Sequence, residues 1–236
     1  MEDIKKYQIL FKDKFSENHL IILGINHFTN LNGSDSKKYF NSLVVLNHQL
    51  EILSLYNKVN LVPFGEFLPF EKTLSKFGLK KITPGYSSFS PGDTRMIINL
   101  GNKFNEKLIL PLICYEIIYP GKIKKKNQLP DLVINISEDA WFGRSIGPHQ
   151  HFTKAIYRSI EEGVFIARSA NRGISAFINP NGKVLKSINT RESGNIELHF
   201  PYFYKSTLFS NYGNKIFFLI ILLYTLLTLI FKKFKI

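Results

Sequence analysis

Short runs of apolar residues, bounded by polar or turn-forming residues, recur along most of the chain. Such runs are typical of buried strands. They predict strands over residues 20–25 (LIILGI), 41–47 (NSLVVLN), 51–62 (EILSLYNKVNLV), 108–117 (LILPLICYEI), 131–137 (DLVINIS), 163–170 (GVFIARSA) and 173–188 (GISAFINPNGKVLKSI). An Asn-His-Gln turn separates the second run from the third, and Pro180, Asn181 and Gly182 favour a hairpin turn inside the last run.

Two segments instead place apolar residues at helical spacing. Residues 4–15 predict an amphipathic first helix, and residues 146–162 predict a second helix between two predicted strands. Because helices and strands are interleaved, the pattern indicates an α/β or a layered α+β domain.

The C-terminal segment has a different pattern. Residues 216–231 (IFFLIILLYTLLTLIF) carry no charge, and Lys215, Lys232, Lys233 and Lys235 flank them. A run this short can span a bilayer when the flanking lysines snorkel and when residues 208–212 lengthen it. A buried core helix is the alternative, but core helices rarely lack a polar stripe. We therefore predict a globular domain over 1–206 and a transmembrane helix with a basic tail over 207–236.

Composition narrows the possible partners. The chain has 236 residues, of which 44% are hydrophobic and 21% charged, so it is long enough for one sizeable core and does not have the composition of a disordered chain. A net charge of +13 suits an acidic partner, which means nucleic acid or an anionic membrane. Because basic residues flank the apolar segment, we favour the membrane and expect no nucleic-acid partner. The single cysteine excludes a disulfide framework and a Cys-based structural zinc site.

That cysteine, Cys114, ends an apolar run and is followed by Tyr115 and Glu116. Reactive groups of α/β folds lie beyond the carboxyl ends of strands, so Cys114 is a candidate nucleophile. Packing is the commoner role of a cysteine in an apolar run.

Two other segments carry candidate chemistry. Lys58 lies in a predicted strand, Glu66 follows it eight residues later, and Pro63 and Gly65 bend the backbone between them. This bend can aim both side chains into one cleft, although each could equally be a surface residue. The segment 137–151 follows a predicted strand and contains Trp141, the only tryptophan, and loops of this kind usually shape a pocket.

Taken together, these segments resemble a known family. LVPFGEFLP, ICYEI, DAWFGxSxGPxQH and RSxNxGISAxI occur in this order, and they resemble the apolipoprotein N-acyltransferases, which are membrane-bound members of the nitrilase (carbon-nitrogen hydrolase) superfamily. The resemblance extends from about Ile4 through the terminal apolar helix. It implies a four-layer αββα sandwich, which is an α+β fold, and a Glu-Lys-Cys catalytic triad.

The resemblance also implies a role for individual residues. Cys114 matches the nucleophile, Lys58 the catalytic lysine and Glu66 a second required glutamate, while Tyr115 and Glu116 match the residues that flank the nucleophile. A strand pair behind the active site is matched by Ser169, Asn171, Gly173 and Ser175. Acyl chains could contact the loop residues Phe67, Phe70, Tyr86, Phe89 and Trp141, of which we single out Phe67 and Trp141 as substrate-binding.

The implied reaction has two steps and needs no cofactor or metal. Cys114 takes an acyl chain from a membrane phospholipid as a thioester, and the α-amino group of a lipid-modified cysteine at the start of an apolipoprotein then accepts the chain. Lys58 stabilises the thiolate and the oxyanion. The resemblance places the chain in a bacterial inner membrane, and the positive-inside rule predicts a cytoplasmic C-terminus and an extracytoplasmic domain.

Two departures from the family pattern accompany the resemblance. Glu138 stands where the family usually has Asn. The family also carries several membrane helices and a strand ending in the catalytic glutamate before the helix that matches residues 4–15. We therefore expect the general base to be missing here, so that the chain is one part of a split enzyme whose N-terminal half is a separate partner, or a remnant. A tail-anchored amidase that uses water as acceptor, and an inactive membrane-anchored binding domain, are the alternatives.

Overall fold

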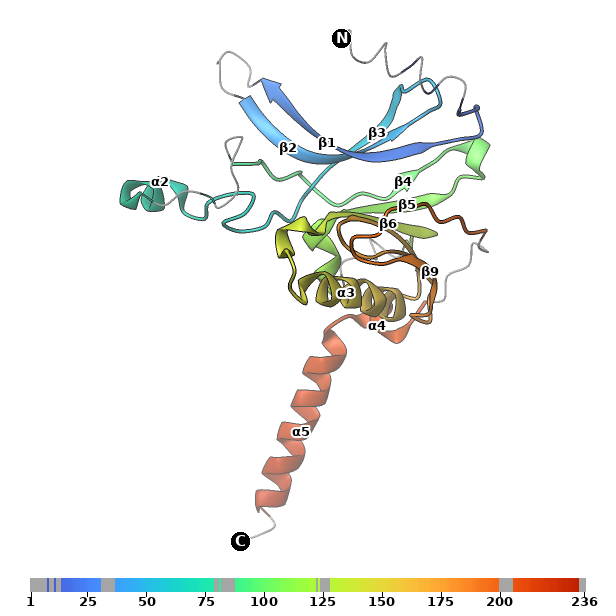
Figure 1. Ribbon diagram of the computed structural model, residues 1–236. Coiled ribbons are helices and arrows are strands. Elements are labelled where there is room, and N and C mark those ends of the chain that lie inside the picture. Colours follow the sequence, from blue (N-terminus) through green and yellow to red (C-terminus); the bar gives the residue numbers. More distant parts are fainter. Residues whose placement is uncertain are drawn as a thin grey trace.

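A computed structural model describes most of the chain: residues 8, 11, 14–30, 37–78, 81, 88–121, 123, 128–199 and 206–233. Two β-sheets face each other, helix α3 covers the far side of the larger sheet, and a long helix, α5, projects from the body (Figure 1). Most of the helix predicted over 4–15 lies outside the described residues, as does Tyr86. Of the four described positions in that range, Gln8 and Phe11 are helical, whereas Lys14 is in a turn and Phe15 is not helical.

The smaller sheet is antiparallel and contains β1 (Ile21–Asn30), β2 (Lys37–Leu46) and β3 (Ile52–Asn57) in that order. Leu43 of β2 pairs with Gly24 of β1 and with Tyr56 of β3. The strand predicted over 20–25 is longer than expected, because β1 pairs with β2 along its whole length.

The larger sheet has the order β4-β5-β6-β7-β8-β9. Its strands β5, β6 and β7 are parallel, while β4, β8 and β9 pair antiparallel. The bounds are β4 (Ile98–Asn99), β5 (Leu108–Ile113), β6 (Leu132–Glu138), β7 (Phe165–Asn171), β8 (Ser175–Ile178) and β9 (Val184–Ile188). The predicted hairpin turn at 180–182 connects β8 to β9.

Side chains of β5 alternate between two cores, as the period of a strand requires. Ile109 and Ile113 pack between the sheets with Leu43, Val45 and Tyr56 of the smaller sheet. Leu110 and Leu112 pack on the opposite side, against Ala155 of α3. This layering confirms the predicted α+β sandwich, with two sheets and one helix layer within the described residues.

Helix α3 (Gly147–Glu162) coincides closely with the predicted helix over 146–162. Pro148 lies in its first turn, and Gly163 ends it with a φ of 68° and an N–H that donates to the Ser159 carbonyl. The buried face carries several polar side chains, namely His151, Arg158, Ser159 and Glu162. Helix α3 therefore places polar side chains, as well as apolar ones, in the buried interior of the protein.

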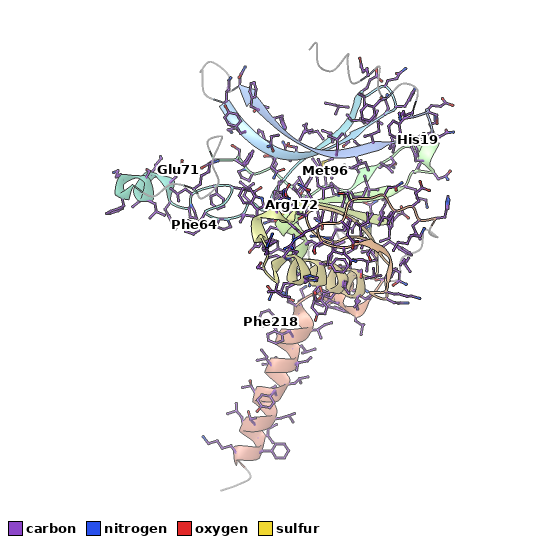
Figure 2. The ribbon with its side chains drawn as sticks, in the orientation of Figure 1. His19, Phe64, Glu71, Met96, Arg172 and Phe218 are labelled. Atoms are coloured by element: carbon purple, nitrogen blue, oxygen red, sulfur yellow. The ribbon has the colours of Figure 1, made fainter. Side chains whose placement is uncertain are left out.

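Helix α4 (Leu208–Tyr212) and helix α5 (Lys215–Lys233) form the C-terminal part. Figure 2 shows Phe218 projecting from α5 clear of the body. Helix α5 is long and apolar enough to cross a membrane, with a mean hydropathy of 2.1 and none of that stretch buried. The idea that residues 208–212 lengthen this helix is wrong, because Gly213, at a φ of 54°, separates α4 from α5.

Two predicted strands end earlier than expected, and the Glu116 carboxylate lies at both ends. The strand predicted over 51–62 stops at Asn57, so Lys58 follows a strand and does not lie within one. The strand predicted over 108–117 stops at Ile113, and Cys114 begins the short 3₁₀ helix η3 (Cys114–Ile118). In both places the carboxylate of Glu116 takes backbone N–H groups that a strand would present to a neighbour.

The remaining short elements lie in loops. They are α2 (Glu71–Leu74), η1 (Ser75–Phe77), η2 (Asn102–Phe104) and η4 (Asp139–Phe142).

Candidate active site

The three parallel strands end at one edge of the larger sheet, and each is followed by a polar or nucleophilic residue. Cys114 follows β5, Asp139 follows β6, and Asn171 ends β7. Because carboxyl ends of neighbouring parallel strands meet at one edge, the topology itself brings these residues together.

Cys114 occupies a sharp turn at this edge. Its φ is +50°, in the left-handed region that non-glycine residues seldom adopt. The residue is partly buried, and its side chain packs against the core between the two sheets. A strained turn that presents a partly exposed side chain at a sheet edge is typical of a nucleophile.

Glu116 ties this turn to the segment that follows β3. Its fully buried Oε1 accepts hydrogen bonds from Tyr56 Oη at 2.8 Å, Val59 N at 3.0 Å and Asn60 N at 3.1 Å, and Oε2 accepts from Ile113 N at 2.9 Å. Burial, followed by the neighbouring Glu116 carboxylate, raises the pKa of Tyr56, which keeps the phenol a donor. Lys58 directly precedes Val59, so Glu116 holds the Lys58 segment beside the Cys114 turn.

The structure also brings Lys58 and Glu66 together. Lys58 is 1% exposed, and its Nζ lies 2.7 Å from Glu66 Oε2. Glu66 accepts two further hydrogen bonds, from Asn41 Nδ2 at 2.8 Å and from Val62 N at 2.8 Å. The backbone of Lys58 is fixed as well, because its N–H donates to the Asn41 carbonyl and its carbonyl accepts from Gly92 N. The ammonium group is therefore held in one place.

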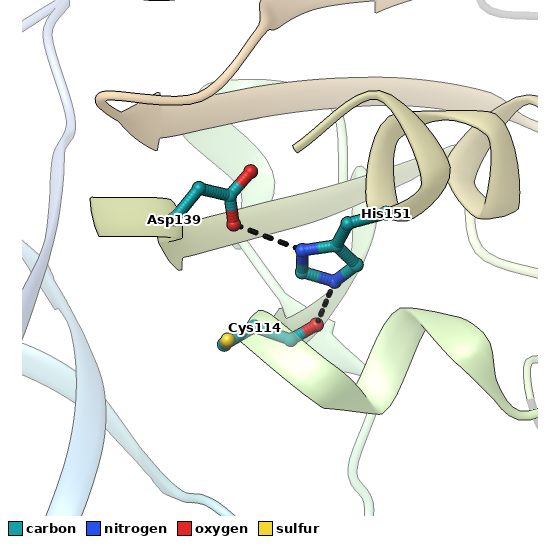
Figure 3. Close-up of side chains that lie close together, drawn as sticks. All are labelled: Cys114, Asp139 and His151. Atoms are coloured by element: carbon teal, nitrogen blue, oxygen red, sulfur yellow. Dashed lines mark hydrogen bonds and ion pairs between the residues drawn. The ribbon is translucent and has the colours of Figure 1, made fainter. Parts of the chain in front are cut away.

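A second charged network was not predicted from the sequence. Buried Asp139 accepts from Arg168 Nη2 at 2.7 Å through Oδ2, and its Oδ1 lies 2.9 Å from His151 Nδ1 (Figure 3). Ser137 Oγ donates to Asp139 Oδ1 at 2.6 Å, and Arg168 also donates to Asn135 Oδ1. Burial opposes the charge of Asp139, but the bonds from His151 and Ser137 and the charge of Arg168 outweigh it and lower the pKa. Burial lowers the pKa of Arg168, and the negative charge of Asp139 partly offsets this lowering.

This network contacts the candidate nucleophile. His151 Nε2 lies 3.2 Å from the Cys114 carbonyl oxygen. Ligand atoms of Cys114, Asp139 and His151 lie within 4.8 Å of one another, and these residue types can bind metals. However, the Arg168 guanidinium lies 2.7 Å from Asp139 and 3.2 Å from His151 Nδ1, so a cation already neutralises these ligands. The arrangement is better described as a hydrogen-bonded ion network than as a metal site.

The other residues singled out from the sequence lie around these two networks. Tyr115 is partly buried, and its ring lies 5.4 Å from that of Tyr119. Phe67 is partly buried and pairs with Pro63. Trp141 is 64% exposed, in the loop before α3. Phe70 is 84% exposed, and Phe89 N donates to the Glu66 carbonyl.

The sequence did contain signals for the residues that were missed. Arg168 is a charged residue inside an apolar run, which is the same signal that singled out Lys58. Asp139 is the second residue after the strand predicted over 131–137, and His151 falls on the buried face of a predicted helix.

Comparison with known proteins agrees with this fold. The carbon-nitrogen hydrolase family model matches residues 15–199, and the chain belongs to that family. A carbon-nitrogen hydrolase from Helicobacter pylori G27 has a similar structure, with a TM-score of 0.55, 16% identity and coverage of 81% of this chain and 64% of that one. An amidase from Nesterenkonia sp. has a TM-score of 0.51, 16% identity and coverage of 80% and 62%. At such identity these likenesses show the fold alone.

Relatives with similar sequences point to a narrower class of protein, because they bear the name apolipoprotein N-acyltransferase. The protein of Rhizobium leguminosarum bv. trifolii is 35% identical over 185 residues, which cover 78% of this chain and 34% of that protein. The protein of Rickettsia prowazekii is 34% identical over 237 residues, covering 98% of this chain and 47% of that protein. The chain thus spans between a third and half of the length of these relatives.

Proposed function

We propose that this chain acts in the transfer of a fatty acyl chain from a membrane phospholipid to the N-terminal lipid-modified cysteine of an apolipoprotein. The names of its sequence relatives and the apolar helix α5 support this proposal. In this proposal residues 1–206 form the carbon-nitrogen hydrolase-like domain, and residues 207–236 anchor it in a bacterial inner membrane.

One observation carries the chemistry: the Glu116 carboxylate connects the Cys114 turn to the backbone directly after Lys58. A thiol with an ordinary pKa of about 8.5 is mostly protonated at neutral pH, and a fixed ammonium nearby favours the thiolate. In this proposal Cys114 is the nucleophile, Lys58 is the activating cation, and Glu66 positions Lys58.

The proposed reaction has two steps. The Cys114 thiolate attacks the ester carbonyl of the phospholipid, the S–C bond forms, the C–O bond breaks, and the lysophospholipid oxygen takes a proton. The α-amino group of the apolipoprotein next attacks the thioester, the N–C bond forms, and the thiolate leaves while the amine loses a proton. Lys58 stabilises the oxyanion in both steps.

Proton transfer is the demanding part, because general acid–base help contributes about 10²–10⁴-fold to such reactions. Among the described residues around the site, each carboxylate is already engaged: Glu66 by Lys58, Glu116 by Tyr56 and three backbone N–H groups, and Asp139 by Arg168. We expect thioester formation by residues 1–236 alone to be slow, and a further carboxylate, for example from a separate N-terminal half, to accelerate it.

The lipid substrates suit the exposed aromatic loops. We propose that Phe67 and Trp141 contact acyl chains and that Tyr115 supports the nucleophile from the turn of η3. The phospholipid donor and the apolipoprotein acceptor are both held at the bilayer surface, where α5 would hold the domain.

The test is direct detection of the thioester. The full chain, in vesicles of phosphatidylethanolamine and phosphatidylglycerol with a labelled acyl chain, should acquire label at Cys114 that hydroxylamine removes. A diacylglyceryl-cysteine peptide should then discharge it as an amide. Cys114→Ala should acquire no label, and Lys58→Ala should acquire it more slowly. Equal labelling of wild type and Cys114→Ala would refute the proposal.

The second candidate function is an amidase that uses water as acceptor, which the same Cys114 and Lys58 could perform. The fold shared with the Nesterenkonia amidase favours it. Release of ammonia from a simple aliphatic amide by the full chain, with no labelled peptide amide formed in the vesicles, would favour this second function.

A further inference from the structure

His151 contacts the candidate nucleophile through the backbone and not through the thiol. Its Nε2 faces the Cys114 carbonyl oxygen at 3.2 Å, while Nδ1 faces Asp139. Figure 3 shows the carbonyl of Cys114 directed toward the imidazole and Sγ directed away from it. The imidazole therefore contacts Cys114 through its backbone carbonyl, while Sγ lies within 4.8 Å of a ring nitrogen.

The conformation of Cys114 needs such support. A non-glycine residue at a φ of +50° is strained by about 1–3 kcal/mol, and it persists only where its surroundings fix it. Rotation about the Cα–C bond changes the direction of the carbonyl relative to the side chain. A hydrogen bond to that carbonyl consequently fixes the direction of the Cα–Cβ bond, about which Sγ has only its staggered positions.

The imidazole is itself held on several sides. Asp139 bonds Nδ1 and is fixed by Arg168 and Ser137. The Phe142 ring packs edge-on against the His151 ring, with the ring centroids 5.8 Å apart. A Cβ on Gly173 would lie 2.2 Å from Asp139 Oδ2, so this glycine leaves Asp139 just enough space. With His151 only 5% exposed, the ring has one orientation open to it.

We propose that His151 is a positioning residue for Cys114: it holds the Cys114 carbonyl, and through it the direction of the Cα–Cβ bond that carries Sγ, while Asp139 and Arg168 hold His151. The inference rests on the proposed role of Cys114 as nucleophile. It adds a buried ion network to the Lys58 and Glu66 pair as a determinant of thiol reactivity.

Two amide substitutions separate the contacts of the ring. The amide nitrogen of Gln coincides approximately with Nε2 of His, and that of Asn with Nδ1. His151→Gln therefore retains a donor for the Cys114 carbonyl and loses the bond to Asp139. His151→Asn retains the bond to Asp139 and loses the donor to the carbonyl.

The experiment measures the rate of alkylation of the full chain by iodoacetamide in detergent micelles, where Cys114 is the only thiol. We expect His151→Asn to react at least about tenfold more slowly than wild type, because small misplacements of a reacting group have effects of this size. The alkylation rate of His151→Gln should stay within about threefold of wild type. If His151 served only to hold Asp139, His151→Gln would instead be the slower of the two variants. Equal rates for the two variants, or the reverse order, overturn the proposal.

Thermal melting of each variant shows whether it is folded. If His151→Asn does not fold, Phe142→Ala replaces it, since Phe142 is 39% exposed and its ring packs against the imidazole ring and over Gly147. A lowered alkylation rate then supports the proposal, and an unchanged rate overturns it. Alkylation does not require lipid, so normal alkylation without thioester formation would count against the proposed function and leave this inference standing.

Discussion

Replacing Glu116 by Gln should destabilise the protein far more than its small change in size suggests. The carboxylate accepts three hydrogen bonds at Oε1 and one, from Ile113 N, at Oε2. A glutamine that keeps its oxygen at the three donors must place its NH₂ group against the Ile113 N–H. One charge-assisted bond of about 1.5–3 kcal/mol is lost, and a buried donor left unpaired costs about 1–3 kcal/mol more. We expect the free energy of unfolding to fall by about 3–5 kcal/mol.

The assay is thermal and urea unfolding in detergent, with Glu51→Gln as the matched control. Glu51 also accepts a side-chain hydrogen bond, from Asn47 Nδ2 at 2.7 Å, but it is exposed, so its substitution should change stability by less than about 0.5 kcal/mol. Alkylation of Cys114 should slow in Glu116→Gln because the Ile113 N–H, directly before Cys114, loses the acceptor that fixes the turn. If Glu116→Gln unfolds within about 1 kcal/mol of wild type, the four hydrogen bonds do not hold the site together as inferred.

Three further predictions concern packing, pH and topology. Gly173→Ala should lose about 1–3 kcal/mol of stability through overpacking against Asp139. Gly194→Ala is the control and should be nearly neutral, because its Cβ would meet only one atom, at 3.8 Å. Similar melting temperatures for the two variants would contradict this prediction. Because the pKa of Asp139 is lowered in the folded state, its contribution to stability is present above the unfolded value of about 3.9 and is lost as pH falls below it. The difference in melting temperature between wild type and Asp139→Asn should therefore shrink from pH 5 to pH 3, and a constant difference would refute the linkage. Lys232 and Lys233 end α5, so protease added to spheroplasts should digest the domain, and protection of the domain would reverse the proposed topology.

The strands were predictable because their apolar runs are local properties of the sequence. The strand end at Asn57 was not, because the acceptor of the N–H groups that follow it comes from far along the chain. Glu116 takes the N–H groups of Val59 and Asn60, which lie 57 and 56 residues away. A sequence window around residue 58 contains no sign of this carboxylate, so the strand was extended past Asn57.

The sequence also predicted part of the candidate site, namely the part whose residues are close together along the chain. Lys58 and Glu66 are eight residues apart, and a bent segment between them suffices to bring their side chains together. Arg168 and Asp139 are 29 residues apart and meet only because β6 and β7 pair in parallel. The register of that pairing, which sequence alone does not specify, decides which charged residues face one another.

The position of α3 next to the long apolar helix α5 has a consequence for the proposed path of a lipid. Thr207 Oγ1, at the start of α4, donates to the Glu161 carbonyl at the end of α3, and α5 begins just beyond α4 (Figure 1). In a bilayer spanned by α5, the layer formed by α3 is therefore the one nearest the headgroups, and the smaller sheet is the farthest. Cys114 lies at the end of a strand on the other side of α3, and a helix is about 10 Å thick. Under the proposed function, a phospholipid ester must rise out of its leaflet by roughly that thickness before the thiol can reach it, so extraction of the lipid would precede the chemistry.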